Sequence, residues 1–265
     1  MQTFEINLIK NLFITFFISN IFAISSAKSE QQLNLYSARQ EVLMKPLIND
    51  FERKTGIQVN IVAAKANQLI NRILKEGEYT KADILLTSDV ARLTSAKKKK
   101  LFTIVESEKL DRLVPEKYKD KEKKWFGLSL RARLLIYNKK KLGLGDFQGY
   151  MVLSNKKWKN KILVRSSNNV YNQSLIAAMI INYGENKVKN FLNNFVNNFA
   201  RNPSGGDRDQ IRAVLSGEGD VALVNSYYFL KMKDKDKENK YKNLLAYFPK
   251  DKYMFTHINI SGAGI

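Results

Sequence analysis

The sequence predicts an α/β protein made of two lobes of similar size. Apolar runs typical of buried strands alternate with amphipathic helices along the chain, and the first five elements form a β-α-β-α-β series. Such a series indicates a parallel sheet with helices on both faces. A second alternation of strands and helices begins near residue 130, and an apolar segment near residue 247 can cross back. We therefore expect the chain to leave the first lobe, build the second and return.

The first lobe is expected to contain short strands separated by two helices. The first helix ends at Gly56 and carries four apolar side chains on one face, which are Val42, Leu43, Leu47 and Phe51. The second helix spans 68–75 and stops before Gly77. The last strand is a continuous apolar run, as expected of a strand buried on both faces. The three strands are predicted over 33–36, 58–63 and 82–87.

The second lobe follows a lysine-rich stretch and opens with a long strand over 128–137, which Arg131 and Arg133 interrupt. Asp207 is expected to cap a later helix, and Gly217 closes that helix. The remaining predictions are strands over 161–165 and 221–225, helices over 174–183, 187–199 and 210–215, a short helix near Tyr227, and an apolar segment over 243–248.

The composition limits the chemistry that the chain can perform. The chain has 265 residues, of which 44% are hydrophobic, no cysteine and a single histidine, His257. Disulfides, thiolate metal sites and multi-histidine zinc sites are therefore excluded, and any metal must be held by oxygen ligands. Ser37, Ser166 and Ser226 follow strands but have no histidine near them in any motif, and we expect His257 to have a packing role. We do not expect an enzyme.

The first residues have the pattern of an export signal. Lys10 supplies a positive charge, an apolar stretch runs over 12–24, and small residues precede a cleavage point after Ala27. We expect residues 1–27 to be a signal peptide and the remainder to reach the periplasm. The alternative is an N-terminal membrane anchor, although the stretch is short for a span of about 20 apolar residues.

The formal charge is +20, which raises nucleic-acid binding as one interpretation. The lysines are scattered or occur in runs at 97–100, 119–124 and 231–240, and neither a zinc finger nor an RNP-type aromatic motif accompanies them. With an export signal, this pattern favours solvated faces, and we expect no nucleic-acid partner. A basic nucleic-acid-binding protein is the alternative from another class, and its binding to duplexes would weaken steeply with salt.

Tyrosines mark the places where a ligand is expected to bind. In open α/β sheets ligands bind outside the carboxyl ends of the strands, and Tyr171, Tyr227 and Tyr228 fall at predicted strand-to-helix turns of the second lobe. A phenol has a pKa of about 10, but coordination to a hard trivalent cation stabilises the phenolate. Oxygen-only ligation suits Fe³⁺ better than zinc or copper. The alternative for each tyrosine is plain packing.

Several stretches carry a resemblance to a known family. From Leu33 onward the chain resembles the bacterial periplasmic ferric-ion-binding proteins, the bacterial transferrin branch of ABC-transporter solute receptors. The matching stretches are LYSARQ at 35–40, FERKTGI at 51–57, ADILLTSD at 82–89, WFGLSLRAR at 125–133, RSSNNVYNQSL at 165–175, GGDRDQIRA at 205–213, GEGDVALVNSYY at 217–228 and INISGAG at 258–264.

The resemblance implies the type II periplasmic-binding-protein fold, in which two sheets are joined by hinge strands and two lobes close over the ligand. Residues 28–130 with a return segment at 248–265 are expected to form lobe 1, and residues 131–247 to form lobe 2. The implied iron ligands are Tyr171, Tyr227 and Tyr228. Arg39 and Arg131 are the implied anion contacts, with Arg133 as a substitute, and hinge-strand salt bridging is the alternative role for these arginines.

The chain departs from the family pattern in two places. Some members add a His-Tyr pair after the arginine of the opening motif, where this chain has Gln40 and Glu41. This departure implies the branch that uses three tyrosines with a synergistic anion such as carbonate, and Glu41 is only a possible first-lobe contact. Members also continue beyond the 261–264 motif, whereas this chain stops at Ile265. The C-terminal part of lobe 1 is therefore expected to be missing, which would leave apolar surface uncovered.

The resemblance implies a monomeric receptor that captures Fe³⁺ and delivers it to an inner-membrane ABC permease. The alternative is a receptor of the same fold for an organic or oxyanion solute. In that case Arg39, Arg131 and the turn at 166–167 would hold a carboxylate or phosphate without metal.

Overall fold

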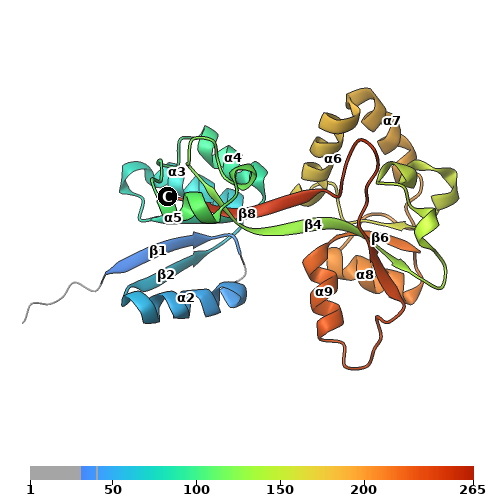
Figure 1. Ribbon diagram of the computed structural model, residues 1–265, viewed down its shortest axis with the longest axis horizontal. Helices are drawn as coiled ribbons and strands as arrows, with labels where there is room; N and C mark the ends of the chain where they lie inside the picture. Colours follow the sequence, from blue (N-terminus) through green and yellow to red (C-terminus); the bar gives the residue numbers. More distant parts are fainter. Residues whose placement is uncertain (1–30, 40) are drawn as a thin grey trace, which may run out of the picture.

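The computed structural model describes residues 31–39 and 41–265, which form two lobes joined by two long strands (Figure 1). These strands are β4 (Phe126–Asn138) and β8 (Ile258–Gly264), and they run antiparallel side by side between the lobes. The predicted signal peptide lies outside the described residues. Among the described helices, none combines the length and the apolar character needed to cross a membrane.

The sheet of lobe 1 is mostly parallel at one edge and antiparallel toward the hinge. Its order is β2 (Gln58–Ala63), β1 (Gln32–Ser37), β3 (Ile84–Ser88), β8 and the first half of β4. β1 pairs parallel with both β2 and β3, whereas β3 pairs antiparallel with β8. The helices of this lobe are α2 (Glu41–Thr55), α3 (Ala66–Glu76), α4 (Val90–Lys98) and α5 (Glu108–Leu113), and α3 and α4 cover one face while α2 covers the other.

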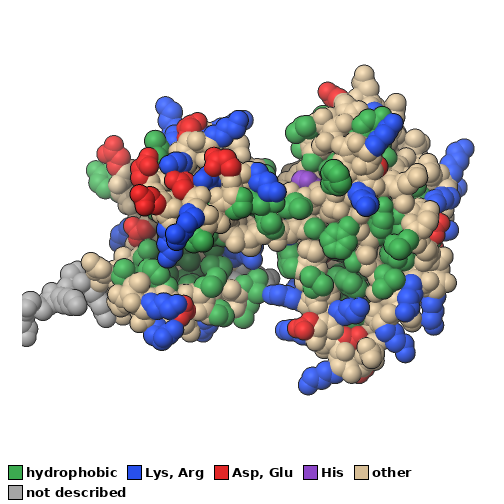
Figure 2. Space-filling view, in the orientation of Figure 1, with side chains coloured by type: hydrophobic (Ala, Val, Ile, Leu, Met, Phe, Trp, Pro, Cys, Tyr) green, Lys and Arg blue, Asp and Glu red, His purple; other side chains and the backbone are tan. Residues whose placement is uncertain are grey.

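Helix α2 turns a different face to the sheet from the one that the sequence predicted. Ile48 is its buried residue and packs with Leu35 and Leu86, whereas Val42 is 72% exposed and Leu47 is 66% exposed. Two residues of the stripe expected to face the core therefore face solvent, whereas Leu43 of that stripe is half-buried, and the core on this side of the sheet is small. Figure 2 shows hydrophobic side chains on the visible faces of both lobes, with Lys and Arg side chains likewise spread over both.

Lobe 2 is a second sheet with helices on both faces. The second half of β4 pairs antiparallel with β6 (Val221–Asn225) and β7 (Leu244–Tyr247), and β5 (Ile162–Leu163) pairs parallel with β6. Its helices are α6 (Val170–Tyr183), α7 (Glu185–Val196), α8 (Asp207–Ser216) and α9 (Ser226–Asp234). Short 3-10 turns span Gly77–Tyr79 and Glu116–Tyr118 in lobe 1, and Leu144–Asp146, Met151–Ser154 and Lys156–Trp158 in lobe 2.

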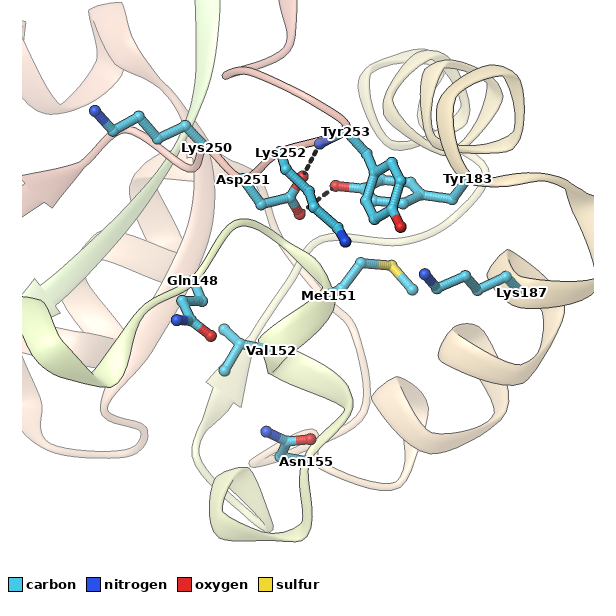
Figure 3. Close-up of a pocket in the computed structure, with 10 residues that line it drawn as sticks. All are labelled: Gln148, Met151, Val152, Asn155, Tyr183, Lys187, Lys250, Asp251, Lys252 and Tyr253. Atoms are coloured by element: carbon cyan, nitrogen blue, oxygen red, sulfur yellow. Dashed lines mark hydrogen bonds between the residues drawn. The ribbon is translucent and has the colours of Figure 1, made fainter.

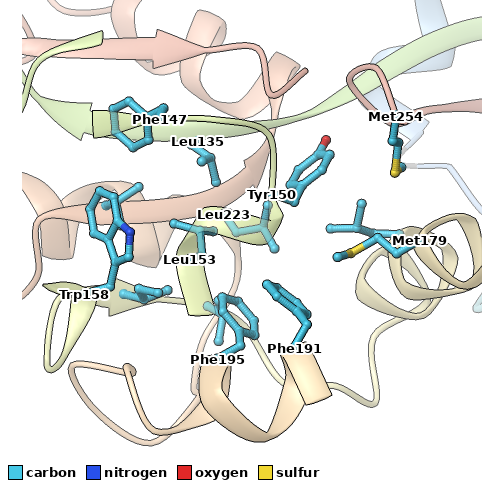
Figure 4. Close-up of a cluster of buried hydrophobic side chains, with 14 of the residues drawn as sticks. Leu135, Phe147, Tyr150, Leu153, Trp158, Met179, Phe191, Phe195, Leu223 and Met254 are labelled. Atoms are coloured by element: carbon cyan, nitrogen blue, oxygen red, sulfur yellow. The ribbon is translucent and has the colours of Figure 1, made fainter. Parts of the chain in front are cut away.

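The cores of the two lobes are separate. The largest cluster packs α6 and α7 against the sheet of lobe 2 and includes Met179, Phe191, Phe195 and Trp158 (Figure 4). A second cluster packs α8 and α9 on the opposite face of that sheet. Burial of these apolar side chains stabilises each lobe by itself, so the link between the lobes is carried by the two strands and by a few polar contacts.

The chain stays with lobe 2 beyond residue 248. Met254 is buried in the main core of lobe 2, and the Asp251 carboxylate accepts a hydrogen bond of 2.6 Å from the Tyr183 hydroxyl of α6. We propose that the return to lobe 1 begins with β8, at Ile258, rather than at residue 248.

Candidate functional site

Three tyrosines from lobe 2 line one small cavity that reaches across to lobe 1. The cavity has a volume of about 140 Å³ and is lined by Arg39, Leu43 and Ser88 from lobe 1 and by Tyr171, Tyr227, Tyr228, Arg208 and Lys231 from lobe 2. We call it the tyrosine cleft. Except for Lys231, which lies further along α9, its residues lie at or just after the carboxyl ends of β1, β3 and β6 or in the first turn of nearby helices, which is the usual ligand position in α/β sheets.

The local sequence explains why the tyrosines meet. All five residues of β6 are buried, and the chain turns at Asn225 directly into α9, so Tyr227 and Tyr228 occupy the first turn of that helix. Neighbours on a helix point about 100° apart, but a helix start lets both rings lie close, with centroids 4.1 Å apart. Tyr171 occupies the first turn of α6, where the Asn169 side chain accepts a hydrogen bond of 2.9 Å from its backbone N–H.

The phenol groups interact with one another. Burial raises the pKa of Tyr227 well above its usual value of 10.0, and the nearby hydroxyls of Tyr171 and Tyr228 raise it further. Without a cation, Tyr227 therefore stays protonated at neutral pH, because ionising neighbouring phenols together places like charges side by side. A bound trivalent cation reverses this preference, since it stabilises each phenolate directly.

Basic side chains surround the tyrosines. The guanidinium of Arg208 lies 4.9 Å from the ring centroid of Tyr228, and those of Arg131 and Arg165 lie 4.9 Å and 5.4 Å from that of Tyr171. None of the eight residues that line the cleft is acidic. Within the described part of the chain, no group of three or more His, Cys, Asp or Glu side chains could hold a metal ion.

The three predicted arginines take different positions. Arg39 lines the cleft and donates a hydrogen bond of 2.6 Å to the Ser261 hydroxyl. Arg131 is buried and forms an ion pair of 2.8 Å with Asp89 behind the Tyr171 ring. Arg133 is 1% exposed, pairs with Asp207 at 2.9 Å and does not line the cleft. Salt bridging, the alternative considered for these residues, therefore describes both Arg131 and Arg133, neither of which lines the cleft, and we assign them no contact with a bound anion.

Among the described residues, neither Glu41 nor the turn at 166–167 contributes to the lining of the cleft. Gln40 lies outside the described residues. Glu41 is the exposed first residue of α2 and does not line the cavity. In the turn at 166–167, Ser167 lines a different hollow on lobe 2.

Arg208 and Lys231 are cleft residues that the sequence reasoning missed. Lys231 lies three residues after Tyr228 and four after Tyr227, a spacing that places side chains on the same face of a helix. That spacing could have identified it. Arg208 lies within the GGDRDQIRA stretch, but only the fold brings the first turn of α8 to the tyrosines.

Asp89 connects the two lobes beside the cleft. Its carboxylate is fully buried and accepts hydrogen bonds of 2.8 Å from Arg131 and 2.8 Å from the Ser174 hydroxyl of α6, and it also caps α4 through the Ala91 N–H. Its φ of 114° is rare for a residue with a side chain, and such strain persists only where surrounding contacts hold it. This carboxylate thus ties the end of β3 to a hinge strand and to lobe 2.

His257 packs at the hinge, just before β8. Burial lowers the pKa of His257 to about 4, Arg131 and Arg133 lower it further, and Asp89 opposes them. Its Nε2 atom is buried without a hydrogen-bond partner among the described residues. The side chain is therefore neutral in the folded protein at neutral pH, as its packing role requires.

We expect His257 to make the protein less stable in mild acid. Because the unfolded chain has the higher pKa, near 6.5, the unfolded state binds more protons between pH 6.5 and 4. The contribution of neutral His257 to the free energy of unfolding is therefore complete above pH 6.5 and is lost as the pH falls toward 4. Between pH 7.5 and pH 5 the free energy of unfolding should fall by about 2 kcal/mol. Urea unfolding at both pH values should show a smaller pH-dependent loss for His257→Gln than for the parent. Equal losses would contradict this assignment.

Comparisons with known proteins bear on the cleft and on the fold. The family of bacterial extracellular solute-binding proteins matches residues 79–253. Iron uptake protein A1 of Synechocystis is 41% identical over 239 residues, which are 89% of this chain and 66% of that protein. The chain thus spans slightly less than two thirds of the length of that relative.

Two solved structures resemble the chain along most of its length. One is FutA of Trichodesmium in complex with iron and citrate, with a TM-score of 0.81, 40% identity, and coverage of 88% of this chain and 75% of that chain. Another is the apo ferric ion-binding protein A of Pasteurella haemolytica, with a TM-score of 0.83, 40% identity, and coverage of 89% and 74%.

Proposed function

This chain belongs to the family of bacterial extracellular solute-binding proteins, and we propose that it captures Fe³⁺ through Tyr171, Tyr227 and Tyr228. The predicted two-lobed type II fold is confirmed by the similarity to ferric-binding structures, and the family consists of solute-binding transport proteins rather than enzymes. One observation carries the proposal. Three phenols from two separate helix starts line a cleft whose described lining contains no acidic residue.

The charge of the cleft supports a metal together with an anion. Three phenolates would neutralise Fe³⁺, and their formation would release three protons, so binding should weaken in acid. Arg39, Arg208 and Lys231 would then leave an excess of positive charge beside the metal. We infer that a small carboxylate or carbonate anion completes the coordination, with Arg39 and Arg208 as its contacts. The Trichodesmium relative, solved with iron and citrate, supports this class of anion.

The setting that we propose is the periplasm, where the protein acts as a monomer. Lobe closure about β4 and β8 would enclose the metal, because the cleft takes residues from both lobes. The closed form would deliver Fe³⁺ to the permease of an ABC transporter. Family membership supports this partner, since solute-binding proteins of this kind serve such transporters.

Titration with ferric citrate tests the proposed function. We expect the purified chain to become coloured, with a visible phenolate-to-iron charge-transfer band that saturates at one iron per chain and fades when the pH is lowered. Citrate without iron is the control and should give no colour. A colourless protein that the anion stabilises equally with and without Fe³⁺ would contradict iron capture and favour a receptor for an organic or oxyanion solute.

A further inference from the structure

A second and larger hollow lies on lobe 2, away from the tyrosine cleft. Its volume is about 470 Å³, and none of its lining residues lines the cleft. It is formed where the turn around Met151, the junction of α6 and α7, and the loop before β8 meet (Figure 3). Its lining residues are Gln148, Met151, Val152, Asn155, Tyr183, Lys187, Lys250, Asp251, Lys252 and Tyr253. We call it the lysine hollow.

The one acidic residue of the lysine hollow is already engaged. The Asp251 carboxylate accepts hydrogen bonds of 2.6 Å from the Tyr183 hydroxyl and of 2.7 Å and 2.9 Å from the backbone N–H groups of Tyr253 and Met254. Gly149, at a φ of +65°, lets the neighbouring turn approach this carboxylate, since an added Cβ there would lie 2.5 Å from Asp251 Oδ2. Burial opposes ionisation of Asp251, but these hydrogen bonds and the charge of Lys187 together hold its pKa below the usual value, so Asp251 shapes the loop and offsets only one of the three lysine charges.

The lysines of the hollow lack carboxylate partners. Among residues 31–39 and 41–265, Lys187, Lys250 and Lys252 form no ion pair, although salt bridges are frequent elsewhere in the same part of the chain. The Nζ atoms of Lys187 and Lys252 lie 4.9 Å and 4.8 Å from the ring centroid of Tyr253. The two ammonium groups are thus within about 10 Å of each other around one ring. Figure 3 shows both in the hollow near Met151, while Lys250 extends away.

The rings of Tyr183 and Tyr253 form one side of the hollow and lie against the lysine ammonium groups. The Tyr183 and Tyr253 rings contact each other edge to face, with centroids 5.8 Å apart, and Lys187 also lies over Tyr183 at 5.7 Å. The three lysines of the lining outnumber the single Asp251 carboxylate, which leaves a net positive charge that an anion entering between Lys187 and Lys252 would offset. Met151 and Val152 provide an apolar floor, and the amides of Gln148 and Asn155 add hydrogen-bond donors at the edge.

We propose that the lysine hollow is a second binding site, for a small oxyanion that carries at least two negative charges. Lys187 and Lys252 supply the charge, and the exposed Tyr253 hydroxyl supplies a further donor. A polycarboxylate such as citrate and inorganic phosphate share this chemistry. The site does not depend on iron, because it shares no residue with the tyrosine cleft.

Isothermal titration calorimetry of the iron-free chain tests the proposal. Citrate and inorganic phosphate are titrated separately at constant ionic strength set by sodium chloride. Both titrations are repeated on an Arg39→Gln, Arg208→Gln variant, in which the tyrosine cleft keeps Lys231 as its one cation among the described lining residues, so that most of the remaining heat should come from the lysine hollow. We expect saturable binding of at least one anion in this variant, and we expect added Lys187→Gln and Lys252→Gln substitutions to weaken it about tenfold or more.

Lys189→Gln is the matched control, since Lys189 is exposed on the same helix α7 two residues from Lys187 and does not line the hollow. It should leave the affinity unchanged. Binding of citrate alone would identify a polycarboxylate site, and binding of both anions a general oxyanion site. Absence of saturable binding, or equal weakening by Lys189→Gln and by the Lys187 and Lys252 substitutions, would overturn the proposal. The ferric colour of the cleft is a separate readout, so failure here leaves iron capture standing.

Discussion

Replacing Tyr227 by phenylalanine should remove most of the ferric charge-transfer band and lower the affinity for iron by on the order of 100-fold or more. Substitution of groups that merely support metal ligands typically costs 10- to 100-fold, and a lost ligand should cost at least as much. Tyr227 is the most informative of the three tyrosines, because its hydroxyl interacts with those of both Tyr171 and Tyr228. Its loss therefore removes the phenol oxygen that lies nearest to both other ligands.

The measurement is a visible absorption titration with ferric citrate, followed by competition with a chelator of known affinity. Tyr79→Phe is the control, because Tyr79 is 91% exposed and lies in lobe 1 away from the cleft. The free energy of unfolding of Tyr79→Phe should lie within about 0.5 kcal/mol of that of the parent, and that of Tyr227→Phe within about 2 kcal/mol. A Tyr227→Phe variant with the colour and affinity of the parent would show that the metal is not held by this phenol.

The positions of the three tyrosines could be predicted from the sequence, because each follows a recognisable apolar strand and a polar turn. The run at 221–225 is apolar throughout, so a buried strand was predicted there and β6 has the same bounds. The polar turn and the helix after it then place Tyr227 and Tyr228 at the carboxyl end of that strand. Tyr171 follows the same logic after β5, with Asn169 as the helix cap.

Other features depend on contacts that the sequence does not encode locally. The sequence pattern did not reveal β8 as a strand, because small residues interrupt its apolar alternation. The structure explains these residues, since a Cβ added at Gly262 would lie 2.4 Å from the backbone oxygen of Phe126 on β4. The close approach of two hinge strands that are far apart in sequence therefore requires glycine, and only the fold shows this.

Asp207 is a similar case. The sequence predicted it as a helix cap, but the cap position is Gly206, and the Asp209 carboxylate accepts the hydrogen bond of 2.7 Å from the Gly206 N–H. Asp207 instead points into the protein and is 1% exposed. Its role was hidden because its partners Arg133 and Arg165 come from other segments of the chain.

The largest effect on stability is expected from Asp207→Asn, which should lower the free energy of unfolding by about 3 to 5 kcal/mol. The carboxylate pairs with Arg133 at 2.9 Å and with Arg165 at 3.1 Å, and it accepts a hydrogen bond of 2.7 Å from the Asn225 N–H. Arg133 is 1% exposed, so removing the negative charge leaves a buried guanidinium without its counter-ion. Breaking a buried pair in this way costs more than the pair itself contributes.

Urea unfolding of Asp207→Asn and of Asp50→Asn compares the loss of a buried carboxylate with the loss of an exposed one, and so shows how much of the stability effect is due to burial. Asp50 also has two basic partners, Arg53 and Lys54, but its side chain is 45% exposed and solvent screens these pairs, so its loss should cost far less stability than the loss of Asp207. Because Asp207 holds the backbone of Asn225, two residues before Tyr227, we also expect Asp207→Asn to weaken iron binding at temperatures where the variant is still folded. Equal stability losses for the two variants would mean that the buried network does not organise the end of β6, and the tyrosine pair would then need another support.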